Sequence, residues 1–210
     1  MLGRRDRIRV VGLTGGLCAG KSEVARYLRG FGIPVLDADR IGLKQARRGG
    51  PAYERLVTEF GTAILGPALE IDRAALARLA MSNDATRRRL EAITHPLIIA
   101  EIERRLGVLE EMGVGLAVIE AALLVETRLC DDMDGIVVVV AKTELRLARA
   151  AARGMSLDDA RARMGVQVSE QELLAHADFI LRNDGSKEEL RREVARLAAA
   201  LLAEATCRKD

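Results

Sequence analysis

Aromatic side chains and cysteines are scarce in this chain. It contains no Trp, two Tyr and three Phe, so aromatic residues make up 2% of 210 residues. This scarcity argues against a stacking platform for single-stranded nucleic acid or a carbohydrate groove. Cys18, Cys130 and Cys207 stand far apart with no Cys-x-x-Cys pair, which indicates neither a disulfide framework nor a zinc site. Such cysteine usage favours a reducing compartment, and we expect a cytoplasmic protein.

An excess of charge of one sign and long apolar runs are also missing. The 33 Lys and Arg residues face 31 Asp and Glu residues, a formal net charge of +2. We therefore expect no nucleic acid polymer as a partner, and any bound anion should sit in a local cradle. No stretch reaches the roughly 18 uncharged apolar residues of a membrane span, and the arginine-rich start is unlike a signal peptide. We expect no membrane partner, and a monomer or weak homo-oligomer.

Segments rich in β-branched residues alternate with Ala, Leu and Arg segments of helical period. The chain is 49% hydrophobic, enough to bury a substantial core. The segments predicted as strands are 8–13, 34–37, 115–121, 135–141 and 177–181. Five buried strands separated by helices predict an α/β fold with a five-stranded parallel sheet covered on both faces, hence three layers.

Two helical segments exceed what a simple crossover requires. The stretch between the second and third strands predicts helices at 39–47, 51–60, 73–81 and 83–112, with Thr94-His95-Pro96 interrupting the last. We interpret 39–113 as a helical substrate-binding insertion and 156–176 as a helical lid, at whose start Ser156 and Asp159 resemble a capping signal. The nucleotide-binding core then comprises 1–38, 114–155 and 177–210, with a last helix at 186–205 whose apolar residues share one face.

The most informative stretch, Gly15-Gly16-Leu17-Cys18-Ala19-Gly20-Lys21-Ser22, fits the pattern G-x-x-x-x-G-K-[ST] between a predicted strand and a predicted helix. Glycines let successive N–H groups point inward, Lys21 reaches the terminal phosphates, and Ser22 can ligate Mg²⁺. A glycine-rich turn without a ligand is the alternative interpretation. The expected nucleotide-binding residues are Gly15, Gly16, Cys18, Ala19, Gly20, Lys21, Ser22 and Glu23. The same cradle serves small-molecule kinases, GTPases and motor ATPases.

Acidic side chains end two of the predicted strands. Asp37 and Asp39 follow the second strand, where a carboxylate can orient or deprotonate an acceptor hydroxyl, or cap the next helix. Glu120 ends the third strand, and we expect it to hold the water shell of Mg²⁺, with Ser22 as the other metal-site residue. A charge in so apolar a run is costly unless it has a partner. An isolated His95 is more typical of a structural residue.

Three arginines, Arg146, Arg149 and Arg153, recur at helical spacing on the segment that leads into the predicted lid. Arginines so placed can neutralise charge on a transferring phosphoryl group. We expect Arg149 and Arg153 to be catalytic and Arg146 to belong to a solvated basic face. A chain of this length with two additional helical segments suits a nucleotide-type kinase. Such an enzyme must close over a small acceptor and keep water away from the γ-phosphate.

In this order the motifs resemble the dephospho-coenzyme A kinase family across nearly the whole chain. The matching stretches are Gly12-Leu13-Thr14-Gly15-Gly16, Gly20-Lys21-Ser22, Asp37-Ala38-Asp39, Phe60-Gly61, Ile64-Leu65, Asp72-Arg73, His95-Pro96, Leu123-Leu124-Val125-Glu126, Gln167, Ala177-Asp178 and Asn183-Asp184-Gly185. The resemblance implies a P-loop NTPase-like fold with a coenzyme A-binding insertion and a lid. It also implies Mg²⁺-dependent transfer of the γ-phosphoryl group of ATP to the ribose 3′-hydroxyl of dephospho-coenzyme A, the last step of coenzyme A biosynthesis.

The resemblance also implies roles for single residues. Asp39 would be the acceptor-facing carboxylate, Thr14 and Lys21 would be active-site partners, and Arg149 or Arg153 would contact the phosphates. The residues implied to lie near the acceptor are Thr14, Asp39, His95, Leu124 and Glu126. Because phosphoryl transfer depends mostly on positioning and charge stabilisation, we expect Asp39 to orient the hydroxyl more than it abstracts a proton.

Several positions depart from the family pattern. Cys18 stands where a small, glycine-like residue is usual, and Glu23 replaces Thr and places a carboxylate near the phosphates. Glu120 stands where Asp is common, Ala122 replaces a proline, and Gly42-Leu43 replaces Ala-Arg. These departures leave two alternatives open, a kinase for another nucleoside or nucleotide acceptor, or a nucleotide-binding regulatory protein that has lost catalysis.

Overall fold

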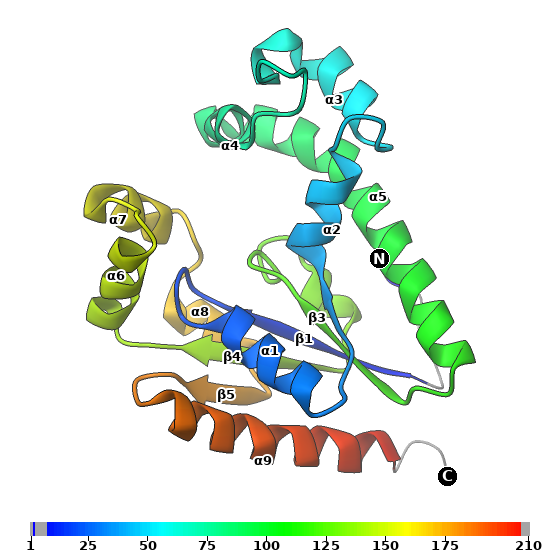
Figure 1. Cartoon of the computed structure of the whole chain (residues 1–210), viewed down its shortest axis with the longest axis vertical. Coiled ribbons are helices and arrows are strands. Elements are labelled where there is room, and N and C mark those ends of the chain that lie inside the picture. The colour runs from blue at the N-terminus through cyan, green and yellow to red at the C-terminus, as the bar shows by residue number, and fades with distance from the viewer. Residues whose placement is uncertain (1, 3–7, 207–210) are drawn as a thin grey trace. The chain divides into compact units, whose positions relative to one another are not determined.

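The computed structural model describes Leu2 and residues 8–206, except for the side chains of Arg73 and Met81. Cys207 lies outside the described residues. The chain divides into two compact units, the first made of Met1–Asp37 and Leu106–Asp210 and the second of Ala38–Arg105. Figure 1 shows the course of the chain through both units.

The first unit contains a five-stranded sheet in which every neighbouring pair of strands is parallel. The strands are β1 (Arg9–Gly15), β2 (Val35–Asp37), β3 (Leu116–Glu120), β4 (Gly135–Val140) and β5 (Phe179–Arg182). Their order is β2-β3-β1-β4-β5, so β1 lies at the centre. The predicted parallel α/β sheet is confirmed, and each predicted strand boundary agrees with the structure within two residues.

Helices cover the sheet because its central strands are apolar on both faces. The helices of the first unit, besides the end of α5, are α1 (Lys21–Gly30), α6 (Thr143–Ala152), α7 (Leu157–Gly165), α8 (Glu170–Ala175) and α9 (Lys187–Thr206), with a 3₁₀ turn η2 (Leu129–Asp132). One core cluster joins Leu28 of α1, Val194 and Leu201 of α9, and Leu13 and Val139 of the strands. In Figure 1, α1 and α9 lie along the same face of the sheet. The predicted last helix and its apolar face are confirmed.

The segment predicted as a lid, residues 156–176 and called the lid segment below, contains two short helices, α7 and α8. The hydroxyl Oγ of Ser156 accepts a hydrogen bond from the N–H of Asp159 at 3.1 Å, so the predicted capping signal is confirmed. Ser169 caps α8 in the same way by accepting from the N–H of Glu172 at 3.1 Å. The loop 166–169 between these helices is therefore anchored at its end by a cap.

The second unit is helical and has its own core. Its elements are α2 (Ala38–Gln45), α3 (Tyr53–Phe60), a 3₁₀ turn η1 (Thr62–Ile64), α4 (Arg73–Ser82) and most of α5 (Asp84–Glu111). Ala52, Leu56 and Ile64 are buried at the centre of its core. Asp72 caps α4, where its Oδ1 accepts from the N–H of Ala74 at 2.8 Å.

The expected interruption of the long helix at Thr94-His95-Pro96 is wrong, because α5 continues through Pro96. Proline removes one backbone donor from a helix interior. A helix of 28 residues keeps many hydrogen bonds on either side of that point. Thr94 stays within the helical pattern, with its Oγ1 donating to the carbonyl of Leu90 at 2.9 Å.

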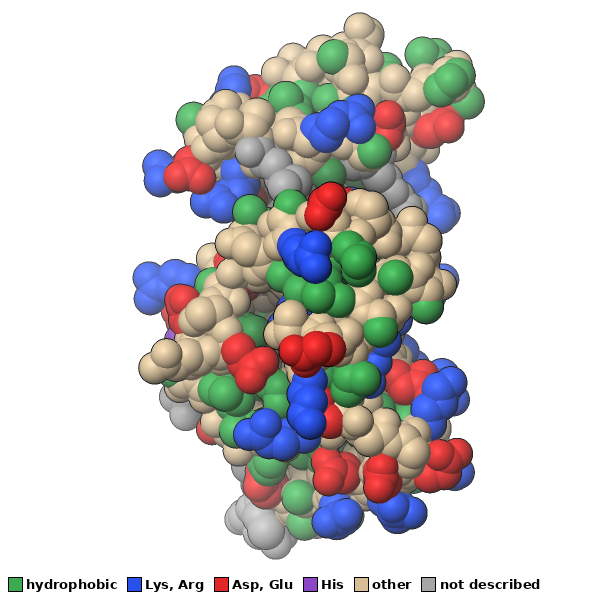
Figure 2. Space-filling model, turned by 90° about the vertical axis from the view of Figure 1, so that its left-hand side faces the viewer, with side chains coloured by type: hydrophobic (Ala, Val, Ile, Leu, Met, Phe, Trp, Pro, Cys, Tyr) green, Lys and Arg blue, Asp and Glu red, His purple; other side chains and the backbone are tan. Residues whose placement is uncertain are grey.

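The surface carries both signs of charge. On the face drawn in Figure 2, Lys and Arg side chains are interspersed with Asp and Glu side chains. Within residue 2 and residues 8–206, no helix is both long enough and apolar enough to cross a membrane.

We predict that Leu201→Ala lowers the free energy of unfolding by about 2–5 kcal/mol, because the side chain is fully buried between α9 and the sheet. Leu202→Ala is the matched control, since its side chain is 44% exposed and its loss should cost less than about 1 kcal/mol. Urea unfolding of both variants measures the difference. Equal losses would contradict the packing of α9 described above.

Candidate active site

The cradle, defined as residues Gly15–Ser22, connects the end of β1 to the start of α1. Its last glycine, Gly20, has a φ of 114°, a left-handed conformation that side chains disfavour. A Cβ atom at Gly20 would lie 2.0 Å from the side-chain nitrogen of Asn183. The glycine is therefore required both by the turn and by the close approach of β5.

Side chains from outside the cradle bind its backbone carbonyls. Asn183 Nδ2 donates to the carbonyl of Ala19 at 2.7 Å, and Arg149 Nη1 lies 3.3 Å from the same oxygen. Arg146 Nε donates to the carbonyl of Leu17 at 2.8 Å. In a trans peptide the C=O and the next N–H point in opposite directions. The N–H groups of Cys18 and Gly20 are therefore directed away from these donors, as an anion-binding turn requires.

Lys21 begins α1 and folds back over the cradle. Its ammonium Nζ donates to the carbonyls of Gly15 at 2.5 Å and Gly16 at 3.2 Å. These contacts hold a cation next to the backbone amides at the positive end of α1. The predicted role of Lys21 at a terminal phosphate stays a prediction.

Ser22 and Glu120, the two residues predicted for a metal site, lie together. Ser22 Oγ donates to Glu120 Oε1 at 3.0 Å, across 98 residues of sequence. Strand order explains the meeting, because β3 pairs with β1 and its last residue, Glu120, is in register with Leu13. Arg29 Nη2 lies 3.9 Å from Glu120 Oε2, so the carboxylate has the partners that its burial demands.

The environment of Glu120 disfavours the charged form of its carboxyl group and so raises the pKa. Its side chain is 8% exposed, and burial raises the pKa above the ordinary carboxyl value of 4.5, while the hydrogen bond from Ser22 opposes that shift. Asp37, in register with Glu120 on β2, raises the pKa further by like-charge repulsion. A divalent cation would relieve both penalties by favouring the ionised form.

A hydroxyl and a carboxylate oxygen are ligands that Mg²⁺ accepts, and Mg²⁺ normally takes only one or two carboxylates together with water and substrate phosphates. Among the described residues there is no group of three or more His, Cys, Asp and Glu side chains arranged to hold a metal. The Ser22 and Glu120 pair therefore fits an ion that also needs phosphate oxygens, and does not fit a cage made of protein ligands alone.

Glu23, a departure from the family pattern, is paired within its own helix. Arg26 Nη2 and Nε donate to its two carboxylate oxygens at 2.6 and 3.1 Å. The hydrogen bond from Arg26 lowers the pKa of Glu23, so the residue is ionised at neutral pH with an adjacent counter-charge. This pairing reduces the repulsion that a carboxylate would otherwise exert on a nearby phosphate.

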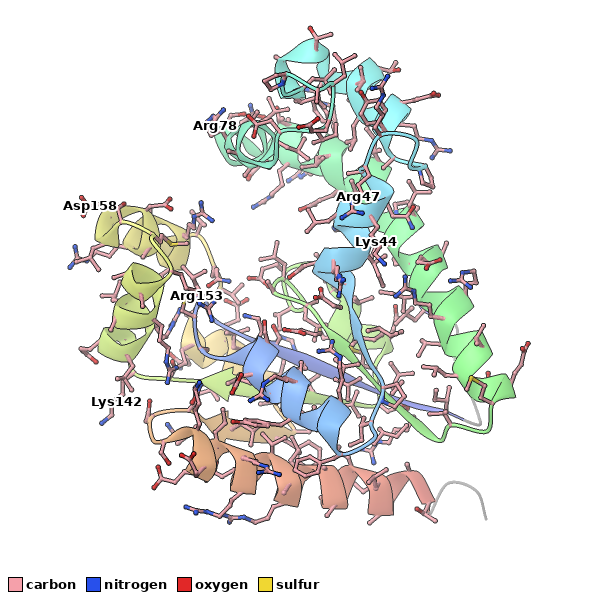
Figure 3. All side chains as sticks on the ribbon, viewed as in Figure 1. Lys44, Arg47, Arg78, Lys142, Arg153 and Asp158 are labelled. Carbon is pink, nitrogen blue, oxygen red and sulfur yellow. The ribbon has the colours of Figure 1, made fainter. Side chains whose placement is uncertain are left out.

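The three arginines differ in burial and in what they bind. The expectation that Arg146 belongs to a solvated face is wrong, because it is half-buried, binds Leu17 and has its pKa lowered by burial. Arg149 binds the backbone of the cradle and, through Nη2, the carbonyl of Asn183 at 2.8 Å. Arg153 is the exposed member of the three. Figure 3 labels it beside the turn between β1 and α1, where its Nη1 lies 4.0 Å from Cys18 Sγ.

The residues implied to lie near an acceptor are spread over both units. Thr14 and Leu124, in the first unit, are fully buried, and the hydroxyl of Thr14 has no hydrogen-bond partner among the described residues. Glu126 is exposed and accepts from the N–H of Val168 in the lid segment at 3.4 Å. In the second unit, Asp39 is exposed in the first turn of α2 and His95 is half-buried on α5.

Sequence reasoning assigned no role to Gln167 and Asn183, although both belong to stretches that match the family pattern. Gln167 Oε1 accepts from the N–H of Leu17 at 2.8 Å. Asn183 is a buried polar side chain whose amide meets a carbonyl 164 residues away in sequence. Neither contact produces a periodic pattern in the sequence. The match of these residues to the family pattern was therefore the available sign that they have a role.

The parallel sheet, the cradle at the end of its central strand and the Ser22 and Glu120 pair define a P-loop phosphotransferase. The sequence profile of the family described as dephospho-CoA kinase matches residues 9–189. The dephospho-CoA kinase of Geobacter sulfurreducens is 39% identical over 186 residues, which cover 88% of this chain and 94% of that protein. The chain belongs to the dephospho-CoA kinase family.

Two solved structures share the fold of this chain. A crystal structure from Thermus thermophilus is 35% identical, has a TM-score of 0.82 and covers 93% of this chain and 98% of its own. A dephospho-CoA kinase from Campylobacter jejuni, 24% identical with a TM-score of 0.61, covers the same two shares and supports the fold.

We predict that Glu120→Gln stabilises the fold at neutral pH. A raised pKa in the folded state means that the wild-type protein loses stability as pH rises from 4.5 through the folded value, since the unfolded chain releases its proton first. The glutamine variant, which keeps an acceptor for Ser22, should lack this decline.

Urea unfolding of both proteins at a series of pH values measures the effect. A free energy of unfolding that falls with pH in the glutamine variant as it does in wild type would show that Glu120 is not the source.

Proposed function

We propose that this chain transfers the γ-phosphoryl group of ATP to the ribose 3′-hydroxyl of dephospho-CoA, giving CoA and ADP. The observation that carries the proposal is the cradle, whose carbonyls are bound from outside by Asn183, Arg149 and Arg146, so that the N–H groups of Cys18 and Gly20 point the opposite way, as a phosphate site requires. Family membership supplies the acceptor.

The residues of the first unit act mainly by positioning and by charge. The cradle amides and the start of α1 bind the phosphates, and Lys21 moves from the Gly15 and Gly16 carbonyls to the terminal phosphate. Ser22 and Glu120 would hold Mg²⁺, Ser22 directly and Glu120 through water. When bound, Mg²⁺ would neutralise charge on the phosphate oxygens.

Arg153 is the better candidate of the two predicted arginines for contact with the transferring phosphoryl group. Arg149 is already bound to the backbone of Ala19 and Asn183, which makes it a positioning residue. Arg153 is exposed at the carboxyl end of α6 beside Cys18. Its guanidinium can follow the lid segment and supply charge as the reaction proceeds.

The second unit, extended to the predicted limits 39–113, is the proposed acceptor-binding insertion. It contains a cavity of about 570 Å³ lined mostly by apolar side chains, together with Arg47, Arg48 and one acid, Glu70. Figure 3 shows Lys44 in the last turn of α2 and Arg47 just after that helix. Apolar walls with cations suit an acceptor that combines an uncharged arm with phosphates. Asp39 would orient the 3′-hydroxyl, with Thr14, His95, Leu124 and Glu126 near the acceptor.

An acceptor panel tests the proposal. The purified protein is incubated with ATP, Mg²⁺ and one acceptor at a time, including dephospho-CoA, nucleosides and nucleotides, and products are identified by mass. We expect phosphorylation of dephospho-CoA at a rate far above the other acceptors. A faster product from another nucleotide, or ATP binding with no product from any acceptor, would contradict the proposal.

Lys21→Ala should lower kcat for CoA formation by about 10²-fold or more, because it removes the cation at the terminal phosphate. Lys142→Ala is the control, since Lys142 is an exposed lysine at the start of α6. Initial rates at saturating substrates compare the two variants. Near wild-type turnover in Lys21→Ala would be incompatible with the role of the cradle.

A further inference from the structure

Leu17 of the cradle has both of its backbone polar groups bound by distant side chains. Its N–H donates to Gln167 Oε1 at 2.8 Å, and its carbonyl accepts from Arg146 Nε at 2.8 Å. The two partners are 150 and 129 residues away in sequence. Gln167 comes from the loop between α7 and α8, and Arg146 comes from α6.

A single peptide group, the one between Gly16 and Leu17, connects the contact made by Gln167 to the contact made by Lys21. The N–H of Leu17 and the carbonyl of Gly16 belong to the same planar group and point in opposite directions. That carbonyl accepts from Lys21 Nζ at 3.2 Å and from the N–H of Ala19 at 3.1 Å. The hydrogen bond that fixes the direction of the Leu17 N–H therefore also fixes the position of the Gly16 carbonyl oxygen, which accepts from the Lys21 ammonium.

The loop that carries Gln167 is attached at more than one point. The neighbouring Val168 donates its N–H to Glu126 Oε1 at 3.4 Å, and Ser169 caps α8. The lid segment thus contacts the cradle through one residue and the segment after β3 through the next. A displacement of this loop would release Leu17 and Glu126 together.

Arg146 completes the clamp from the other side. A Cβ atom on Gly16 would lie 2.4 Å from Arg146 Nη2, so the guanidinium covers the glycine directly. Burial lowers the pKa of Arg146, and Glu170 of the lid segment opposes this shift through its charge. The side chains that bind the peptide groups of Leu17 are therefore a cation, Arg146, and a neutral amide, Gln167.

We propose that Gln167 is a positioning residue for phosphoryl transfer, which with Arg146 clamps the backbone of Leu17 and so couples the lid segment to the placement of Lys21. The proposal rests on the proposed function and deepens it. Gln167 suits the task because its oxygen accepts the N–H without adding negative charge beside a site for a triphosphate.

Two substitutions separate this role from simple stabilisation. Gln167→Met removes the acceptor, and a cavity of about 90 Å³ beside Gln167 and Met164 gives an unbranched side chain room. It should lower kcat about tenfold, the equivalent of one hydrogen bond, with a smaller effect on the KM for ATP. Gln167→Glu keeps an acceptor but adds charge, so it should largely keep kcat and raise the KM for ATP about tenfold at low salt, less at high salt.

Gln171 supplies the matched controls. It is an exposed glutamine on α8 of the same lid segment, and Gln171→Met and Gln171→Glu should leave kcat and KM unchanged. Hydrogen exchange at the Leu17 amide, followed by NMR on the ligand-free protein, should become faster in Gln167→Met and stay slow in Gln171→Met. Thermal unfolding of all four variants checks that each remains folded.

The outcomes distinguish a failure of the proposed function from a failure of the Gln167 clamp alone. If wild-type protein makes no CoA, the proposed function fails and the positioning role fails with it. If wild type makes CoA but Gln167→Met keeps its kcat, or if both Gln167 variants change kcat and KM alike, the clamp alone is overturned. Faster exchange at Leu17 together with a selective fall in kcat would support it.

Discussion

The structure depends on one constraint of backbone chemistry. A turn that binds an anion through its N–H groups must point its carbonyl groups away from that anion. Each buried carbonyl then needs a donor. Here Asn183 donates to the carbonyl of Ala19, Arg149 to that of Cys18 and Arg146 to that of Leu17. Lys21 donates to the carbonyls of Gly15 and Gly16. The donors come from the end of β5, from α6 and from α1, so the cradle draws together elements far apart in the sequence.

The sheet order makes this convergence possible. With β1 at the centre, the cradle follows a strand that has β3 on one side and β4 on the other. The end of β3 supplies Glu120 to Ser22, and the helix that follows β4 supplies two arginines. Ligands of open parallel sheets bind beyond the carboxyl ends of the strands for this reason. The apolar core that fixes the strand order therefore also determines which side chains meet at the cradle.

Much of the fold was predictable from the sequence, because β-branched runs and helical periodicity are local signals. The strands, the capping role of Ser156 and the apolar face of α9 were predicted in this way, as was the cradle. Ser22 and Glu120 were each predicted for a metal site, but the hydrogen bond between them was not predicted. The continuity of α5 through Pro96 was not predicted either, since a local helix breaker was outweighed by the hydrogen bonds on either side.

The contacts of Arg146, Gln167 and Asn183 could not be predicted, because they join side chains to backbone groups over 129 to 164 residues and follow no period. Spacing on a helix identified Arg146 as a surface residue, whereas the approach of the cradle to α6 buries it. The roles assigned to Asp39, His95, Leu124 and Glu126 stay predictions.

Departures from the family pattern acquire physical meaning in the structure. Cys18 has a φ of 58°, which explains why a glycine-like residue is usual there, since a side chain in this conformation costs about 1 kcal/mol or more. Burial against Ala150 and Ala160 offsets part of that cost. The negative charge of Glu23 is balanced by the adjacent guanidinium of Arg26. Neither residue removes a donor from the cradle, so neither argues against phosphoryl transfer.

The most direct test of the central claim follows the transferred phosphorus itself. ³¹P NMR of wild-type protein with ATP, Mg²⁺ and dephospho-CoA should show a phosphate monoester on the ribose 3′ position growing in step with ADP, one for one. ADP that accumulates together with inorganic phosphate and without the monoester would mean that the cradle hydrolyses ATP without an acceptor, and would contradict the account.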